Sequence, residues 1–277
     1  MPLKRRNFVF EVSGRKSVEW RGPGRKGEAH FFNALSLLFP KGERLFMQAL
    51  QDYREHPAVK ADNALVADIK GFIGQEAQHT RVHLDYNEQI QAECPITAHL
   101  NQVTAVIVGA AQKLPRAHRL AITVALEHYT AILAAQILHQ KHLLEDCDSE
   151  YAALWLFHSI EECEHRSVSF DVWSKTQGQG ASAYLARCLA MVLVSPVFWA
   201  TVAYYYAQLS HRDSETGLWA TLKGHAQVAR TLLGRNGVLT AALGDFADFF
   251  KPSFHPSQHD VDTAMNAALA RFSQARA

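Results

Sequence analysis

Apolar residues recur at every third or fourth position along almost the whole chain, from about residue 28 to its end. That spacing puts them on one face of successive helices, whereas the strict alternation that marks a half-buried strand is scarce. The pattern therefore predicts an all-α fold. The expected helices cover residues 28–54, 60–92, 98–112, 116–144, 150–176, 215–233, 237–250 and 258–275.

Proline and glycine divide this helical pattern. Pro40 is expected to kink or restart the first helix, because proline lacks a backbone N–H and clashes with the preceding turn. The linker Gly178-Gln-Gly180 closes a first unit, in which residues 98–112 supply the long crossover of a ferritin-like four-helix bundle. We expect three regions: a basic arm over 1–27, the bundle over 28–177, and a C-terminal helical extension over 178–277 that packs on it.

Two of the expected helices repeat one pair of residues, a glutamate followed three positions later by a histidine. The pairs are Glu76–His79 and Glu162–His165, and the spacing puts both side chains of a pair on one helix face. The helix before each pair carries a lone glutamate on its apolar face, Glu43 in the first case and Glu127 in the second.

Six ionisable side chains on core-facing stripes would be very costly to bury without a metal to pair them. The order Glu, Glu-x-x-His, Glu, Glu-x-x-His along four helices is the ligand set with which a four-helix bundle holds two iron or manganese ions. The sequence therefore predicts a dinuclear metal site. Its predicted ligands are Glu43, Glu76, His79, Glu127, Glu162 and His165.

Three neighbouring residues are candidates for a supporting or additional role. His158 lies one turn before Glu162 on the same face, so it is either a seventh ligand or a histidine that bonds to a ligand carboxylate. Glu161 competes with Glu162, but only Glu162 keeps the Glu-x-x-His spacing, and Glu161 is expected to support a ligand. His83, one turn after the first pair, is expected to orient a ligand rather than bind metal.

Composition and charge narrow the class of protein. The net charge of +1 gives no indication of nucleic-acid binding, and four cysteines without paired spacing predict a reduced, cytoplasmic protein. Residues 1–27 hold eight Lys and Arg. One interpretation of this arm is a solvated tail, and the other is contact with an acidic partner, a lipid surface or an anionic substrate.

Residues 188–209 carry no formally charged side chain and are rich in aromatic residues. The segment is long enough to cross a hydrocarbon core of ~30 Å, and Arg187 and His211-Arg212 flank it as interfacial anchors would. The competing interpretation is a wholly buried helix, kinked at Pro196 and laid across the bundle, or a homodimer interface. The first interpretation would make the protein associate peripherally with a membrane.

Over nearly its whole length the chain resembles a bacterial family of predicted metal-dependent hydrolases. The segments that carry the resemblance are Phe39-Pro40-x-Gly42-Glu43-Arg44, Gln75-Glu76-x-x-His79-x-x-x-His83, Glu127-His128-x-Thr130, His158-x-x-Glu161-Glu162-x-Glu164-His165, Phe170-Asp171 and Phe254-His255-Pro256. The ligand spacing is also similar to that of ferritin-like di-iron oxygenases. In the arylamine N-oxygenases a histidine at the position of His158 is an iron ligand, and the resemblance implies the same role here.

Three functions share this predicted ligand set. The leading expectation is a di-iron oxygenase or oxidase, with two iron ions (manganese or zinc as alternatives) that activate O2 with electrons from an external donor. Its substrate would be a small lipophilic or aromatic molecule, and no catalytic residue beyond the metal ligands is expected. The second is a hydrolase in which the metals lower the pKa of a bridging water. The third is a non-catalytic metal-binding or iron-handling protein.

Overall fold

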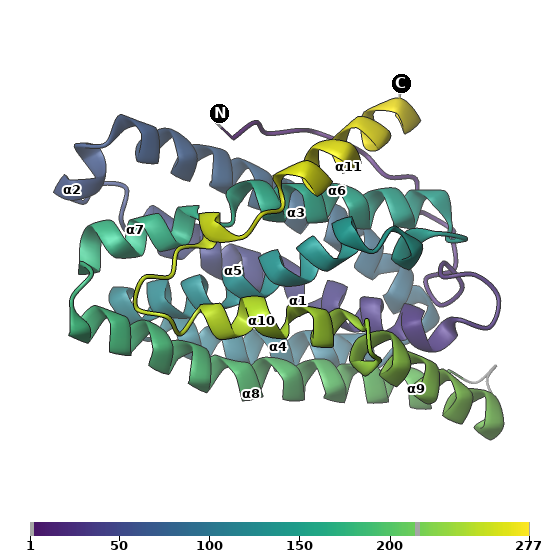
Figure 1. The fold of residues 1–277 in the computed structure, drawn as a ribbon. Coiled ribbons are helices and arrows are strands. Elements are labelled where there is room, and N and C mark those ends of the chain that lie inside the picture. Colours follow the sequence, from purple (N-terminus) through teal and green to yellow (C-terminus); the bar gives the residue numbers. More distant parts are fainter. Residues whose placement is uncertain (1–2, 214–216, 277) are drawn as a thin grey trace.

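The computed structural model describes residues 3–213 and 217–276, which form helices and connecting turns without a β-strand (Figure 1). The prediction of an all-α fold is therefore confirmed. The helices are α1 (Lys26–Gln51), α2 (Pro57–Lys60), α3 (Asn63–Glu93), α4 (Thr97–Gln112), α5 (Arg116–His139), α6 (Ser149–His165), α7 (Val168–Gln177), α8 (Ala181–His211), α9 (Leu218–Leu233), α10 (Val238–Asp248) and α11 (Asp262–Ala275), with 3₁₀ turns η1 (Lys141–Leu144) and η2 (Pro256–Gln258).

Helices α1, α3, α5 and α6 pack side by side, with the closest pairings between α1 and α3 and between α5 and α6. Their apolar faces form two clusters. One contains Phe32, Tyr86 and Trp155, and the other contains Phe46 and Phe72. On α1 and on α3, one part of the helix belongs to the first cluster and another part to the second. The predicted metal ligands of each helix lie between these two parts. The ionisable residues therefore form a polar layer inside an apolar core.

Helix α1 continues through Pro40 without a break, so the expectation that this residue restarts the helix is wrong. Proline cannot donate to the carbonyl four residues earlier, which here belongs to Ser36. The Asn87 side chain on α3 replaces that donor, because its Nδ2 donates to the Ser36 carbonyl at 3.0 Å. Glu43 consequently lies inside a regular helix, and the freed carbonyl links α1 to α3 one turn from the site.

Two expected helices end earlier than their patterns indicated. The segment 116–144 is helical only to His139 and then forms η1, and the segment 150–176 is divided by Arg166 and Ser167 into α6 and α7. His165 is thus the last residue of α6, and α7 restarts where the Asp171 N–H donates to the Ser167 carbonyl. Gly178 ends α7 with a φ of 83°, in the left-handed region that glycine adopts at little cost.

The N-terminal arm is irregular but packed, so the interpretation as a solvated tail is wrong for its described residues. Trp20 is 1% exposed and stacks on Tyr151, with ring centroids 5.7 Å apart. Arg21 is fully buried and its guanidinium donates to Glu28 on α1 at 2.8 Å. Several basic residues of the arm, among them Arg6, Arg15 and Arg21, thus pair with acidic residues of the same chain.

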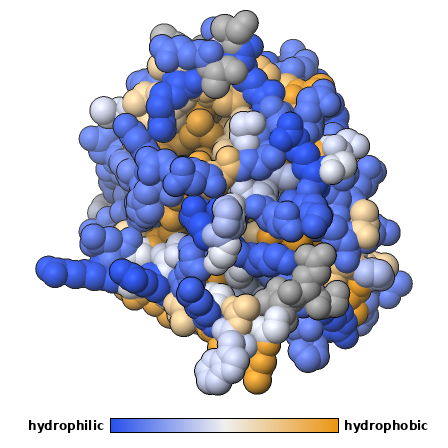
Figure 2. Space-filling view, turned by 90° about the vertical axis from the view of Figure 1, so that its right-hand side faces the viewer, coloured by the Kyte–Doolittle hydropathy of each residue, from blue (hydrophilic) through white to orange (hydrophobic). Residues whose placement is uncertain are grey.

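Helix α8 runs along the outside of the molecule, at the lower edge of Figure 1, and packs on α1 and α5. It and α5 are long and apolar enough to cross a membrane, but 72% of the apolar window of α5 is buried inside the protein and only 17% of that of α8. The expectation of a wholly buried 188–209 helix is therefore wrong. Figure 2 shows the right-hand end of the molecule, where hydrophobic residues reach the surface in several places among hydrophilic ones.

The C-terminal segment is fastened to α7 by two of the motifs noted in the sequence. The rings of Phe254 and Phe170 meet edge to face with centroids 5.6 Å apart. Next to them, His255 Nε2 lies 2.9 Å from Asp171 Oδ1. These contacts give the Phe254-His255-Pro256 segment a structural role, since they hold the chain that connects α10 to α11.

Candidate metal centre

The seven predicted ligands come together in one buried cluster. Each is no more than 3% exposed, and they reach the cluster from four helices of the packed core. Helix α1 contributes Glu43, α3 contributes Glu76 and His79, α5 contributes Glu127, and α6 contributes His158, Glu162 and His165. The i, i+3 and i, i+4 spacings act as expected, because each helix turns its ionisable side chains to the same interior face.

The ligand atoms fall into groups small enough to surround single ions. Atoms of Glu76, Glu127, Glu162 and His165 all lie within 4.8 Å of one another. A second group is formed by Glu43, Glu76 and His79, and a third by His79, His158 and Glu162. Glu76 and Glu162 each belong to more than one group, so the groups overlap. The cluster also contains a group of Glu43, His83 and His158.

Buried polar atoms without hydrogen-bond partners test whether metal ions fit this cluster. Both carboxylate oxygens of Glu76 and of Glu127 have no hydrogen-bond partner, and neither does His165 Nε2. His165 Nε2 lies 3.1 Å from Glu76 Oε1 and 3.4 Å from Glu162 Oε2, without the alignment of a hydrogen bond. Unpaired buried groups of this kind are costly, and carboxylate with imidazole is a donor set that suits iron, manganese and zinc. The residues present therefore fit divalent cations.

The pKa shifts of the buried glutamates and histidines also indicate a site for cations. Burial raises the pKa of Glu43 and of Glu127 well above the ordinary carboxyl value. Burial alone would lower the pKa of His165, but the facing carboxylate of Glu162 outweighs it and raises that pKa well above the usual range. The cluster thus retains protons to offset its surplus of carboxylates. Cations that bound there would displace those protons.

A chain of hydrogen bonds from α1 determines which nitrogen of His158 faces the cluster. The Ser36 hydroxyl donates to Asn87 Oδ1 at 2.7 Å, so Ser36 Oγ accepts from His83 Nδ1 at 2.9 Å. His83 Nε2 is then an acceptor for His158 Nδ1, 3.1 Å away. The remaining nitrogen, His158 Nε2, carries a lone pair and lies 3.3 Å from Glu162 Oε1.

His165 is oriented in a similar way by Gln75. The Gln75 amide nitrogen donates to Glu164 Oε2 at 2.7 Å, which leaves its oxygen to accept from His165 Nδ1 at 3.2 Å. In the neutral imidazole that a metal ligand requires, the proton is therefore on Nδ1, and Nε2 is the nitrogen directed at the carboxylates. Partners that fix a histidine tautomer from outside are typical of metal sites.

Arg6 of the N-terminal arm contacts two glutamates of α6 beside this layer. Its guanidinium makes two hydrogen bonds to Glu164, at 2.6 and 2.7 Å, and one to Glu161 Oε1 at 3.1 Å. The other oxygen of Glu161 lies 3.1 Å from His79 Nε2, and His79 Nδ1 lies 3.5 Å from Glu162 Oε1. Glu161 therefore contacts a histidine and an arginine at the edge of the cluster, whereas Glu162 faces its centre.

Sequence reasoning missed Arg6, Ser36 and Gln75. Gln75 and Glu164 each adjoin a predicted ligand in the sequence, so their supporting role could have been predicted. Arg6 is 155 positions away from Glu161, and no local pattern predicts that contact. His128, next to Glu127, points away from the cluster and its Nε2 lies 3.0 Å from the Asp245 carbonyl oxygen. Burial lowers the pKa of His128 to about 3, as suits a neutral packing residue.

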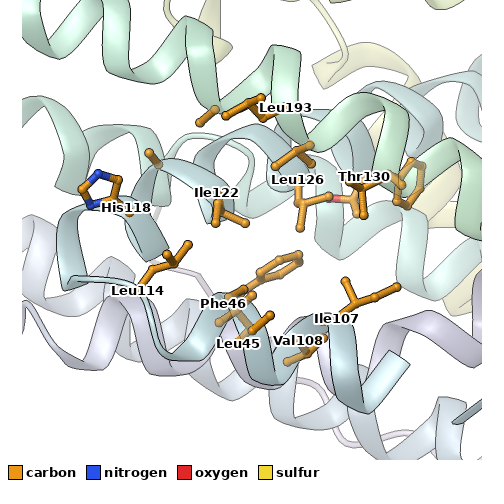
Figure 3. A pocket seen from close by; sticks show the side chains of 18 of the residues that line it. Leu45, Phe46, Ile107, Val108, Leu114, His118, Ile122, Leu126, Thr130 and Leu193 are labelled. Carbon is orange, nitrogen blue, oxygen red and sulfur yellow. The ribbon is translucent and has the colours of Figure 1, made fainter. Parts of the chain in front are cut away.

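An apolar cavity of about 940 Å³ leads to the cluster between α1, α4, α5 and α8. Glu43 and Glu162 form its polar inner wall, and Figure 3 shows apolar side chains such as Phe46, Ile122 and Leu193 pointing into it. His118 lies toward one end of the cavity and Thr130 toward the other. The volume is that of a small-molecule binding site, and the lining suits an apolar ligand.

Comparison with known proteins supports an assignment to a family. Neither the curated proteins nor the solved structures contain a protein that matches the chain. A family model described as "Predicted metal-dependent hydrolase" matches residues 4–260, which include every residue of the cluster. The chain therefore belongs to the family of predicted metal-dependent hydrolases.

Proposed function

We propose that the cluster binds two divalent metal ions at the centre of a ferritin-like four-helix bundle formed by residues 28–177. One ion would be held by Glu76, Glu127, Glu162 and His165. The other would be held by Glu43 and His79 with His158, and the two would share Glu76 and Glu162. The observation that supports this proposal is the set of buried carboxylate and imidazole atoms that have no other partner.

The reaction we propose is metal-dependent hydrolysis of an apolar ester, in keeping with the description of the family. In such enzymes two metal ions polarise the scissile carbonyl and make a water molecule a nucleophile at neutral pH. The residues of this chain would bind the acyl chain in the apolar cavity and hold the ester against Glu43 and Glu162 at its inner wall. Water would add across the acyl–oxygen bond to give an acid and an alcohol.

A second candidate, oxidation of an apolar substrate with O2, is favoured by one specific feature. Four glutamates and four histidines make up the groups of the cluster, and the cavity beside it is almost entirely apolar. A carboxylate-rich site suits redox iron, and a dry cavity would protect a reactive oxidant from water. With iron bound, the site would supply O2 activation, and an external electron donor would be needed.

Metal loading of the chelated protein separates these candidates. We expect two ions per chain after incubation with zinc, manganese or anaerobic ferrous iron, measured by elemental analysis after gel filtration. Hydrolysis would be followed with p-nitrophenyl esters of acetate and decanoate, and oxidase activity by O2 uptake of the ferrous protein with a chemical reductant. Metal-dependent cleavage that favours the decanoate ester would support hydrolysis. Iron-specific O2 uptake without esterase activity would favour the second candidate.

Matched variants connect either activity to the cluster. Glu162→Ala should lose at least one ion and the activity, whereas Glu88→Ala, an exposed glutamate on α3, should retain both. Absence of tight metal binding in the folded wild-type protein would reject the proposal. Two bound ions without either reaction would reject both enzymatic candidates and leave a metal-handling protein.

A further inference from the structure

We propose that the exposed face of α4 and α8 docks on an anionic lipid bilayer and takes up an apolar substrate from it through the mouth of the cavity. The docking itself does not depend on the proposed function. The uptake of substrate does, because it assumes that the cavity serves the metal centre.

The two helices lie antiparallel, and residues of both line the cavity. Near one end, His99 Nε2 lies 3.2 Å from the Tyr204 hydroxyl, and Thr104 Oγ1 lies 2.6 Å from that of Tyr205. Leu114, in the turn after α4, and Ala186, near the start of α8, both line the cavity. The face therefore extends along most of the length of the molecule, as α8 does in Figure 1.

The side chains on this face are apolar to a degree that is unusual for a surface. Among the 16 residues of α4 and the 31 of α8 only Arg187 is formally charged, and it is buried and donates to the Phe249 and Lys251 carbonyls. Several large apolar side chains of the two helices are about half exposed or more. They are Val106 (73%), Leu185 (62%), Leu189 (58%), Val192 (56%), Leu193 (60%) and Val197 (49%). Exposed apolar surface of this extent marks an interaction site.

The cavity opens on this same face. Val106 of α4 and Leu189, Leu193 and Val197 of α8 line the cavity and are also exposed to solvent. A lipophilic molecule dissolved in a bilayer could therefore move from the acyl chains into the cavity without crossing water. A second copy of the chain on this face would instead cover the entrance.

Charge at both ends of the face suits anionic lipid headgroups. Exposed Lys113 and Arg116 follow α4 at one end, and exposed Arg212 and Lys223 follow α8 at the other, while α4, α8 and α9 contain no Asp or Glu. Basic residues beside an apolar surface attract anionic lipids. Trp219 at the start of α9 is 83% exposed, and tryptophan is enriched at the level of the headgroups.

The helix would lie in the plane of the interface rather than cross the bilayer. The opposite side of α8 is buried on the bundle through Met191, Val202, Tyr205 and Leu209. Leaving the bundle would expose that side and unseal the cavity. A helix that keeps one side on its own protein and presents the other side to lipid lies along the interface and does not cross the bilayer.

Vesicle flotation tests this docking surface with the full-length, metal-loaded protein. We expect the wild type to float with vesicles of phosphatidylcholine and phosphatidylglycerol, and less with phosphatidylcholine alone. The double variant Leu185→Glu, Val192→Glu, at two exposed positions of α8 outside the lining of the cavity, should lower the bound fraction about tenfold, since two charges would enter the interface. Leu243→Glu is the matched control, because Leu243 on α10 is 59% exposed but lies outside this face. Circular dichroism and metal content of all variants should equal those of the wild type.

Three outcomes would overturn the proposal. These are wild-type protein that does not float, an equal loss of flotation in Leu243→Glu, and a wild-type dimer in lipid-free solution that Val192→Glu dissociates, which would assign the face to a second copy. Hydrolysis of the soluble acetate ester distinguishes this proposal from the proposed function. The double variant should keep that activity and lose turnover of the decanoate ester presented in vesicles.

Discussion

Glu161 and His79 face each other at the edge of the cluster, with Oε2 of the carboxylate 3.1 Å from Nε2 of the imidazole. The other oxygen of Glu161 accepts a hydrogen bond from Arg6. A carboxylate in this position can hold the histidine so that its Nδ1 is directed at Glu162, and the arginine in turn holds the carboxylate. The irregular arm before α1 is thereby connected to the metal centre that we propose.

Replacing Arg6 tests this connection. In Arg6→Met, Glu161 and Glu164 lose their cation, and we expect metal affinity to fall about 10- to 100-fold, the usual effect of losing a residue that positions a ligand. Competition with a chromophoric chelator measures the affinity. Arg6→Lys should recover part of it, and Arg5→Met, which removes an exposed arginine, should have no effect. Equal affinity in Arg6→Met and wild type would show that the arm does not position the ligands.

His158→Ala should weaken one of the two ions and spare the other. The group of Glu76, Glu127, Glu162 and His165 does not include His158, so we expect one ion to remain bound after dialysis that leaves two on the wild type. His83→Ala removes only the partner of His158 Nδ1 and should have a smaller effect. Elemental analysis after dialysis measures both. Two tightly bound ions in His158→Ala would mean that this histidine is not a ligand.

Filling the cavity should impair catalysis without removing metal. Ile122 lines the cavity and points into it (Figure 3), so Ile122→Trp would occupy space that we assign to the acyl chain. We expect kcat/KM for the decanoate ester to fall at least about tenfold, the effect of about 1.4 kcal/mol of lost binding. Cleavage of the acetate ester and the metal content should change little, and Ile122→Val serves as the conservative control. A uniform loss for both esters would contradict this assignment of the cavity.

The Arg21–Glu28 pair should make stability depend on pH. Burial alone would raise the pKa of Glu28, but hydrogen bonds from Arg21 and Thr231 outweigh it and hold that pKa below the ordinary value. The stabilising contribution is therefore complete above the pKa of the unfolded chain and is lost as pH falls through the lower folded value. Glu28→Gln would leave the buried Arg21 without its carboxylate and should cost about 3 kcal/mol at neutral pH.

Urea unfolding at several pH values measures that effect. The difference in free energy of unfolding between wild type and Glu28→Gln should be constant near neutral pH and should shrink below about pH 4. Glu19→Gln, at an exposed position of the same arm, is the control and should leave the stability almost unchanged. A difference that does not vary between neutral and acidic pH would contradict the ionic contribution of Glu28.

Much of the fold and of the cluster could be predicted because the signals are local. Helical periodicity depends on neighbouring residues alone, and it predicted the all-α fold that the structure confirms. The spacing of Glu76 from His79, and of Glu162 from His165, determines that each pair shares a helix face, whatever packs against it. The convergence of four such faces follows once the helices bury their apolar sides together.

What the tertiary structure decided depends on contacts between distant segments. Pro40 remains inside α1 because Asn87 on another helix bonds to the carbonyl that proline leaves free. Arg6, Ser36 and Gln75 position the histidines of the cluster through partners that no spacing reveals. The sequence of α8 was compatible with burial or exposure, and the packing on α1 and α5 determined that one side faces the core and the other the surface. Local helix geometry thus determined that each Glu-x-x-His pair shares one helix face. Packing between distant segments determined which residues contact those pairs.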